Sequence, residues 1–331
     1  MVRTSSDRNF YLDLGSTSTK VLYKGHVIWH QPTCIALHTH TNSVLRLGSS
    51  AYELVGKTTD TVSVVFPIQH GFITDAQIFE QYMGALLKKL RPNIPLLDHL
   101  MGLPGKLATL SCLTAAEKQV LTKLLPHVGL RRMQLVSQAE AAVHGLDVAD
   151  RAQSHGCLID MGGQVTEVSL IIAGVISQTI RLPWGGVQLT EEIQKALAEQ
   201  TACAISWNTA EKIKCEIGSV VAEKKNEKQS VWGKQVTTHL GKTLVISSAD
   251  VLPVCLKFAH DLVRAVKSIL SEAQPQVVTT ALEQGLFCIG GGSQLRGWEQ
   301  FLSQELQTHI VLPPEPDLVV VKGMAGMVQQ H

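Results

Sequence analysis

The segment CLIDMGGQVTEV, residues 157–168, places an aspartate, two glycines and a threonine directly after an apolar run. A carboxylate buried without a partner costs several kcal/mol, so Asp160 is expected at a strand end where positive charge compensates it. The earlier segment FYLDLGSTSTKV, residues 10–21, has the same pattern. Four residues match at a constant offset of 147 positions, namely Asp13 with Asp160, Gly15 with Gly162, Thr19 with Thr166 and Val21 with Val168. The chain is therefore predicted to consist of two related halves.

The composition is that of a folded globular protein without an excess of either charge. Of its 331 residues, 45% are apolar and 17% are charged, and the formal net charge is +1. This length argues for about two domains, and the charge balance gives no indication of nucleic-acid binding. The first ten residues, MVRTSSDRNF, lack the apolar core of a signal peptide, and no apolar run reaches the ~18 residues of a membrane span. We therefore expect a cytoplasmic protein.

The chain contains seven cysteines, with no C-x-x-C spacing among them. An odd number at irregular spacing is typical of reduced, mostly buried thiols, and predicts neither a disulfide nor a zinc site. His38 and His40 are expected in an exposed edge or loop, because a third metal ligand is not evident.

Both halves open with a predicted strand, a polar turn and further strands. In the first half the strand ends at Leu14, the turn covers 15–18, and strands follow at 20–23 and 27–29; in the second the strand ends at Met161 and the turn covers 162–165. Helical periodicity marks 73–90 and 114–129, separated by a predicted apolar strand at 100–105. This alternation predicts an α/β layered fold in each half.

The rest of the second half shows three further features. Residues 190–205 and 208–220 are predicted helices, the second capped by Asn208 or Thr209. The polar stretch 220–248 lacks helical periodicity and predicts a small inserted strand region, within which EKKNEK (223–228) is expected to be a solvated turn. A long helix at 249–273, a short helix after Pro275, and the segment LFCIGGGSQLRG then predict a third loop of the phosphate-binding type.

Glycine-containing turns of this kind can direct several backbone N–H groups into one concavity and so bind an anion. Two such turns in facing domains would hold one polyphosphate from both sides. Asp13 and Asp160 would hold a hydrated Mg²⁺, an ion that keeps several waters and binds few carboxylates directly. Lys20 either points its ammonium toward the phosphates or is a solvated strand lysine.

These motifs resemble those of the actin, heat-shock chaperone and sugar kinase ATPase superfamily, and most closely the MreB-like bacterial actins. LDLGSTSTKVLYKG resembles the first phosphate loop, IDMGGQVTEVSLI the second, FPIQHGFITD the segment linking the halves, AEKIKCEIGS the nucleotide-binding helix, FCIGGGSQLRG the adenosine loop, and PPEPDLVVVKGMAGMV the closing strand and helix. The resemblance implies two ribonuclease-H-like domains with a nucleotide cleft between them. These are 1–150, with a small insert at about 33–65, and 151–331, with an insert at about 187–250.

The resemblance also implies ATP, with GTP left open, and Mg²⁺ as cofactors. Residues matching the family's nucleotide contacts are Gly15, Ser16, Thr17, Ser18, Lys20, Gly162, Gly163, Gln164, Thr166, Glu211, Lys212, Ile213, Lys214, Gly290, Gly291, Gly292, Ser293, Gln294 and Leu295. Gln138, Asp160 and Asp13 take the catalytic positions, the two aspartates through metal-bound water. Glu211 and Lys214 lie three apart and share a helix face, so an intrahelical ion pair is also expected there.

Two departures from the family pattern bear on hydrolysis. Gln138 stands where MreB proteins usually carry a glutamate; its amide can orient water but cannot act as a general base, so a slow ATPase is expected. Glu140 is the second candidate for that role. Gln164 replaces a third glycine, and would either narrow the γ-phosphate pocket or require an unfavourable φ.

The family resemblance further implies head-to-tail filaments, because heterologous contacts of this kind do not close. In RPNIPLLDHL, residues 91–100, the side chains of Ile94, Leu96 and Leu97 either insert into the inner face of the membrane or simply begin the next strand. Membrane proteins of the cell-elongation machinery would be partners. The alternatives are a chaperone-type ATPase, a sugar or acetate kinase, and a paralogue that polymerises without hydrolysis. Three tryptophans, Trp207, Trp232 and Trp298, are expected to be packing residues.

Overall fold

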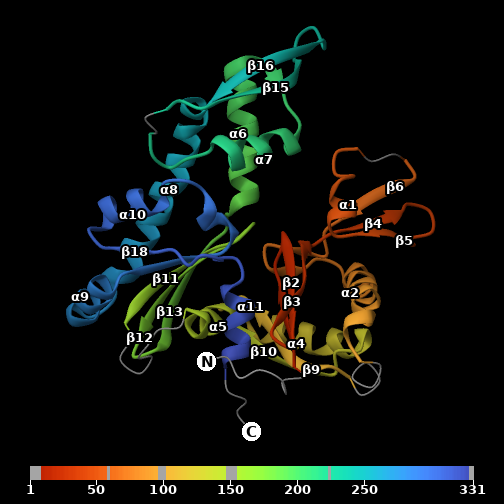
Figure 1. Ribbon diagram of the computed structural model, residues 1–331, viewed down its shortest axis with the longest axis vertical. Helices are drawn as coiled ribbons and strands as arrows, with labels where there is room; N and C mark the ends of the chain where they lie inside the picture. The colour runs from red at the N-terminus through yellow and green to blue at the C-terminus, as the bar shows by residue number, and fades with distance from the viewer. Residues whose placement is uncertain (1–8, 58–59, 96–101, 147–154, 223–224, 328–331) are drawn as a thin grey trace. The chain divides into compact units, whose positions relative to one another are not determined.

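The computed structural model describes residues 9–57, 60–95, 102–146, 155–222 and 225–327, which divide into two compact units. One unit comprises residues 1–151 and 317–331, and the other comprises 152–316. The chain therefore returns to the first unit at Asp317, whereas the sequence-based boundaries carried the second domain to 331. Helix α11 (Val319–Gly326) lies beside α5 (Gln138–Gly145) in Figure 1. Gly323 and Gly145 permit this close crossing, since a Cβ would lie 1.8 Å from the carbonyl oxygen of Ala141 in the first case and 2.2 Å from that of Val319 in the second.

The first unit is built on a five-stranded sheet in the order β10-β9-β1-β2-β3. Its strands are β1 (Phe10–Leu14), β2 (Ser18–Tyr23), β3 (His26–Pro32), β9 (Pro104–Thr109) and β10 (Arg132–Ser137). Strand β1 pairs antiparallel with β2 and parallel with β9. The strand predicted at 100–105 was placed too early, because Gly105 lies inside β9 where the backbone of Phe10 approaches closely. A glycine in a strand often marks such an approach and does not end the strand.

The helices of this unit start at the polar residues that the sequence provides. At the start of α2 (Ala76–Leu90), Asp75 accepts a hydrogen bond from Ile78 N. At the start of α4 (Ala115–Leu124), Thr114 forms a capping box with Glu117. Two short 3₁₀ helices, Arg91–Asn93 and Leu125–Val128, follow them. Ile94, for which insertion into the membrane was one of two alternatives, is only 4% exposed and belongs to the core, so that alternative is wrong for this residue. Leu96 and Leu97 lie outside the described residues.

The predicted insert at 33–65 forms a small sheet of its own. It contains β4 (Ile35–His38), β5 (Val44–Leu47), α1 (Ser49–Tyr52) and β6 (Val62–Val65), with a small core of Cys34, Ala36 and Ala51. The following β7 (Ile68–Gln69) and β8 (Phe72–Ile73) are joined by His70 and Gly71, both with positive φ. The family resemblance implied that the segment 66–75 links the two halves. In the structure this segment lies within the first unit.

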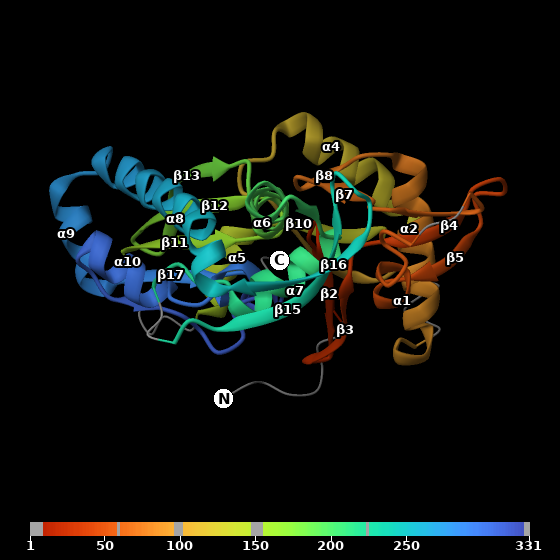
Figure 2. The ribbon, with the colours of Figure 1, turned by 90° about the horizontal axis from the view of Figure 1, so that it is seen from above.

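The second unit contains a five-stranded sheet in the order β13-β12-β11-β17-β18. Its strands are β11 (Gly156–Met161), β12 (Thr166–Ile172), β13 (Val175–Leu182), β17 (Leu286–Ile289) and β18 (Ile310–Val311). The helices α8 (Ser248–Ser271), α9 (Pro275–Gln284) and α10 (Trp298–Leu306) accompany this sheet, and Figure 2 shows α8 along β12 and β13. The two hairpins of the internal repeat are thus each at the centre of a sheet.

An inserted region extends from this sheet in the second unit. It consists of α6 (Gly186–Thr201), β14 (Cys203–Ala204), α7 (Trp207–Ile217), β15 (Lys228–Gln235) and β16 (Gly241–Ser247). Ser206, and not Asn208 or Thr209, caps α7 by accepting from Thr209 N. Trp298 is buried as expected. Trp232 is 72% exposed on β15, so its prediction as a packing residue is wrong.

All seven cysteines are thiols in the structure, and five of them are buried, as the sequence predicted. Burial raises the pKa of Cys34 and Cys157 to about 12 and that of Cys255 to about 11. Because the thiolate is the reactive form, these three side chains act as small apolar residues. Within the described parts of the chain, every helix is too short or too polar to cross a membrane.

Candidate functional site

The two glycine turns of the repeat have the same backbone hydrogen bond. Gly15 N donates to Ser18 O at 3.1 Å, and Gly162 N donates to Val165 O at 2.9 Å. A Cβ at either glycine would lie against the same carbonyl, 2.9 Å from that of Ser18 and 2.7 Å from that of Val165. The sequence repeat is therefore also a repeat in turn geometry. Both turns require glycine two residues after the aspartate, at Gly15 and Gly162.

A chain of buried hydroxyl groups supports the first turn. Thr33 Oγ1 donates to Gly15 O at 2.7 Å, and the same oxygen lies 2.9 Å from Thr19 Oγ1. Tyr82 OH in turn donates to Thr19 Oγ1 at 2.7 Å. Because each hydroxyl has one proton, the direction is fixed from Tyr82 through Thr19 and Thr33 to Gly15. Helix α2 thereby holds the turn, and Gly71 N holds Ser16 Oγ at 3.0 Å.

Asp13 is paired within its own unit. Its Oδ2 lies 3.0 Å from Lys20 Nζ, and the two side chains are 4% and 11% exposed. Gln138 Nε2 donates to the other carboxylate oxygen at 3.4 Å. The positive charge that compensates this strand-end aspartate is thus Lys20, which is not a solvated lysine. The structure brings together Asp13, Lys20 and Gln138, three of the predicted site residues.

Gln138 is the first residue of α5, and the alternative candidate Glu140 lies elsewhere on this helix. Ser137 caps α5 by accepting from Glu140 N at 3.4 Å. The Glu140 side chain is exposed, whereas Gln138 is half-buried against Asp13. Of these two candidates, Gln138 is the one that contacts Asp13 at the end of β1, beside the first glycine turn.

Asp160 has different neighbours. Across the β11–β12 pair it faces Glu167, which occupies the position of Lys20 in the repeat and is buried. Arg181 on β13 is the register partner of Glu167. Asp160 also lies against the third loop, because a Cβ on Gly290 would be 2.5 Å from Asp160 Oδ1. The repeat therefore preserves the backbone but reverses the charge beside the aspartate.

The second turn packs on the N-terminus of α6. Gly186 N donates to Gly162 O at 3.1 Å and Val187 N donates to Gly163 O at 2.7 Å. Gln164 is not among the residues with positive φ, so the predicted backbone strain at this position is not found. Thr166 is fully buried and donates to Trp184 O at 3.0 Å, so it braces the turn from inside.

Helix α7 presents only part of its predicted set to the site. Glu211 and Lys214 form the expected ion pair at 2.7 Å, and Lys214 Nζ also donates to Gly186 O at 2.9 Å. The hydroxyl of Thr190 donates to the Glu211 carboxylate. By contrast, Ile213 is fully buried and Lys212 forms an exposed pair with Glu216. The structure thus separates Lys212 and Ile213 from the other two.

The third loop is a tight turn with one open glycine. The loop runs through a 3₁₀ helix, Gly291–Gln294, and its Gly290 has a φ of 81°. Ser293 is buried and donates to Gly290 O at 2.7 Å, and Trp298 Nε1 donates to Gly292 O at 3.0 Å. A Cβ on Gly291 would meet nothing within 4 Å. Two hydrogen bonds therefore hold the loop, and the backbone at Gly291 is open to solvent.

An open pocket of about 660 Å³ borders this loop. Its lining includes Ser293, Gln294, Leu295, Trp298, Leu312 and Pro316. The loop also touches the end of α7, since a Cβ on Gly218 would lie 3.0 Å from Leu295 Cδ1. Helix α7 and the third loop are thus one packed assembly within the second unit.

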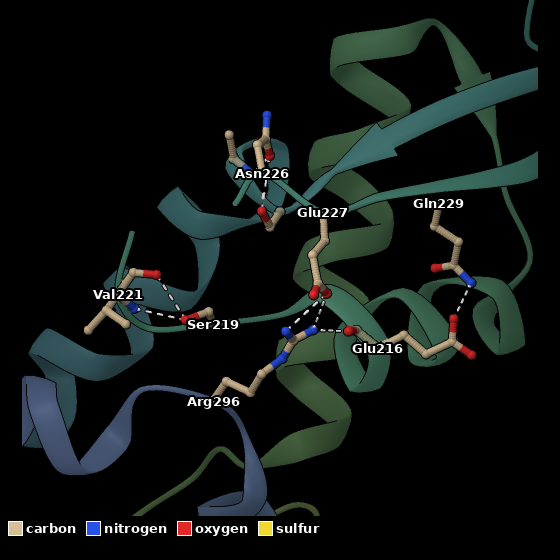
Figure 3. Close-up of polar contacts among 9 residues, drawn as sticks. Glu216, Ser219, Val221, Asn226, Glu227, Gln229 and Arg296 are labelled. Carbon is tan, nitrogen blue, oxygen red and sulfur yellow. Dashed lines mark hydrogen bonds and ion pairs between the residues drawn. The ribbon is translucent and has the colours of Figure 1, made fainter. Parts of the chain in front are cut away.

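Sequence reasoning missed a polar cluster that joins this loop to the insert (Figure 3). Arg296 directly follows the loop and bonds to Glu227, and Asn226 Oδ1 accepts from Ala249 N at 3.2 Å. Both acceptors come from the stretch predicted to be a solvated turn. Asn226 is exposed and the Glu227 side chain is 39% exposed, so they are solvated as predicted, but the prediction did not include these contacts. The sequence offered only an arginine next to the glycine loop, because its partner Glu227 lies 69 residues away in the chain.

The architecture and the paired glycine turns define an actin-like fold. The structure of MreB5 of Spiroplasma citri bound to ADP superposes with a TM-score of 0.88 at 24% identity, covering 95% of this chain and 94% of that one. The MamK double helical filament superposes with a TM-score of 0.80 at 18% identity, covering 96% and 97%. The chain belongs to the MreB/Mbl protein family, whose sequence model matches residues 7–331.

Characterised relatives cover nearly the same length. The cell shape-determining protein Mbl of Bacillus subtilis is 24% identical over 326 residues, which is 97% of this chain and 96% of the relative. The cell shape-determining protein MreB of Escherichia coli K12 is 24% identical over 320 residues, covering 94% and 90%. The expected membership of the MreB-like actins and the actin-like fold are therefore confirmed.

Proposed function

We propose that this protein is a nucleotide-dependent, filament-forming bacterial actin that organises cell-wall elongation and cell shape from the inner face of the membrane. The observation that carries the proposal is the pair of glycine turns with matching backbone geometry, together with the open glycine of the third loop. The family's cell shape-determining members and the neighbours bound to ADP and AMPPNP support it. The MamK filament supports self-association.

In this proposal each unit contributes one phosphate turn. Residues 15–18 and 162–164 would present backbone N–H groups to ATP, and the third loop with Glu211 and Lys214 would contact the base and ribose. A glycine without a Cβ at the open position allows a ring to lie on the backbone, so the residues fit this ligand. A bound Mg²⁺ would neutralise phosphate charge, held through waters by Asp13 and Asp160.

Gln138 is the proposed residue that orients the attacking water. Its side chain is fixed by the hydrogen bond to Asp13, whose charge is balanced by Lys20. An amide directs water by hydrogen bonding but takes no proton at neutral pH. The proposal is accordingly a slow ATPase whose polymerisation depends on nucleotide binding more than on turnover.

Membrane association enters the proposal at the level of the assembly. Ile94 is buried, so the candidates in residues 91–100 reduce to Leu96 and Leu97. A weak contact per protomer gains strength when many protomers are linked in one filament. Head-to-tail self-association and membrane proteins of the elongation machinery are the proposed partners.

The test is high-speed sedimentation with ATP, ADP or no nucleotide, with phosphate release followed in the same tubes. We expect ATP-dependent pelleting with slow phosphate release. Gln138→Ala should lower phosphate release by about 10²-fold, as for loss of a group that positions a reactant, while pelleting persists. Glu140→Gln, an exposed change on the same helix, is the matched control. Nucleotide binding without pelleting under any condition would favour a chaperone-type binding module and contradict the filament proposal.

A further inference from the structure

Arg296 lies where the third loop, helix α7 and the inserted strands meet. It follows Leu295 directly and forms an isolated parallel bridge with Ser219, two residues beyond the end of α7. Its carbonyl accepts from Val220 N at 2.9 Å. The backbone on both sides of Arg296 is therefore fixed to the two segments that would hold the nucleotide base and ribose.

The guanidinium group of Arg296 has two kinds of acceptor. Nη1 and Nη2 each lie 3.0 Å from Glu227 Oε2, and Nη2 also donates to the carbonyl oxygen of Glu216 in the last turn of α7. An arginine suits this position, because its planar fork makes several directed bonds and a cation is favourable at a helix C-terminus. Figure 3 shows these bonds converging from three segments.

Glu227 is held in turn by the start of α8. Its backbone carbonyl accepts from Ser248 N at 2.8 Å, and the adjacent Asn226 Oδ1 accepts from Ser248 Oγ at 3.0 Å. On the next residue but one, Gln229 Nε2 donates to the Glu216 carboxylate at 2.7 Å. The inserted strands thus reach the end of α7 twice, once through Gln229 and once through Glu227 and Arg296.

We propose that Arg296 is a positioning residue for the nucleotide-base loop and that Glu227 of the insert sets how firmly the loop is held. This inference rests on the proposed nucleotide site. The Arg296 and Glu227 side chains are 35% and 39% exposed. Their ion pair is therefore weak and sensitive to salt, and a molecule that binds the inserted strands can reach it. By linkage, whatever breaks this pair weakens binding of the base, and a bound base strengthens the pair.

The experiment compares two ligands of the full-length chain, ADP and inorganic tripolyphosphate, by titration calorimetry at low and high salt. Tripolyphosphate can use the glycine turns but has no base for the third loop. Glu227→Gln keeps the backbone bond to Ser248 and removes only the charge. Glu192→Gln, whose carboxylate pairs with Lys257 on the exposed side of the same unit, is the matched control.

We expect Glu227→Gln to weaken ADP binding about two- to fivefold, the range for an exposed ion pair, and to leave tripolyphosphate binding unchanged. Arg296→Met keeps the aliphatic stem and removes all donors, so it should weaken ADP further, and Glu227→Gln should then add nothing to it. The salt dependence of ADP affinity should be smaller in both variants than in Glu192→Gln.

The outcomes separate the inference from the function on which it rests. Absence of ADP binding by the unmodified chain would remove the proposed nucleotide site itself. Normal ADP affinity in Glu227→Gln and Arg296→Met, both melting like the parent, would overturn the positioning role alone. Equal weakening of ADP and tripolyphosphate would also overturn it, because a general loss of structure moves both ligands.

Discussion

Replacing Lys20 with methionine is expected to destabilise the first unit severely, because it leaves the Asp13 carboxylate buried without its cation. The two groups lie 3.0 Å apart and their side chains are 11% and 4% exposed. Breaking a buried pair costs about 3–5 kcal/mol, and the remaining Gln138 amide places this case at the lower end. About 3 kcal/mol corresponds to a fall of about 6–12 °C in melting temperature for a unit of this size.

The double variant Asp13→Asn with Lys20→Met removes both charges and should recover most of the loss, since the cost lies in the unpaired charge and not in the missing contact. Lys212→Met is the matched control. Lys212 Nζ lies 3.7 Å from Glu216 Oε1 in an exposed ion pair, which should contribute less than about 1 kcal/mol to stability. Melting is followed by circular dichroism without nucleotide, because a ligand raises the apparent stability. If Lys20→Met and Lys212→Met have the same melting temperature, Asp13 and Lys20 do not form this ion pair in solution.

Three other predictions concern the hydroxyl chain, the returning helix and one thiol. Tyr82→Phe removes the first donor of the hydroxyl chain and should cost about 1–2 kcal/mol in urea unfolding; an unchanged midpoint would contradict that bonding order. Lys106 is buried and donates to the carbonyls of Met324 and Met327 at the end of α11, so Lys106→Met should selectively speed amide exchange in that helix. Burial, and to a smaller extent the Glu211 carboxylate, raises the pKa of Cys215. The rate at which Cys215 is alkylated should therefore rise about tenfold for each pH unit below pH 9. ADP should slow this labelling if Glu211 contacts ribose, and equal rates would argue against that contact.

The core of the fold was predictable because it depends on local, periodic signals. Two strand–turn–strand patterns with the same spacing predicted both central hairpins and the position of each glycine turn. The error at 100–105 has a local cause, since Gly105 resembles a strand end but is required by the closeness of Phe10. The capping residue of α7 was also misassigned, because Ser206, Asn208 and Thr209 are all acceptable caps and only tertiary packing selects one.

The features that could not be predicted depend on contacts between distant segments. Nothing near Ile94 indicates that it packs in the core, and Trp232 has the local pattern of a buried strand residue but faces solvent. The bond between Arg296 and Glu227 joins positions separated by 69 residues. For the candidate site, the sequence predicted the ion pair between Glu211 and Lys214, whereas the division of α7 into a bonded face, a core face and a solvent face required the structure.

The return of α11 to the first unit has a consequence for synthesis on the ribosome. Helix α11 packs beside α5, and the carbonyl oxygens of Met324 and Met327 accept hydrogen bonds from the ammonium group of Lys106. The first unit therefore lacks one of its helices until residues 317–327 have been synthesised. The second unit, 152–316, has all of its own strands earlier. The half that is translated second can therefore finish folding first, and a truncated nascent chain would carry an incomplete first unit with the helix-binding surface of α5 uncovered.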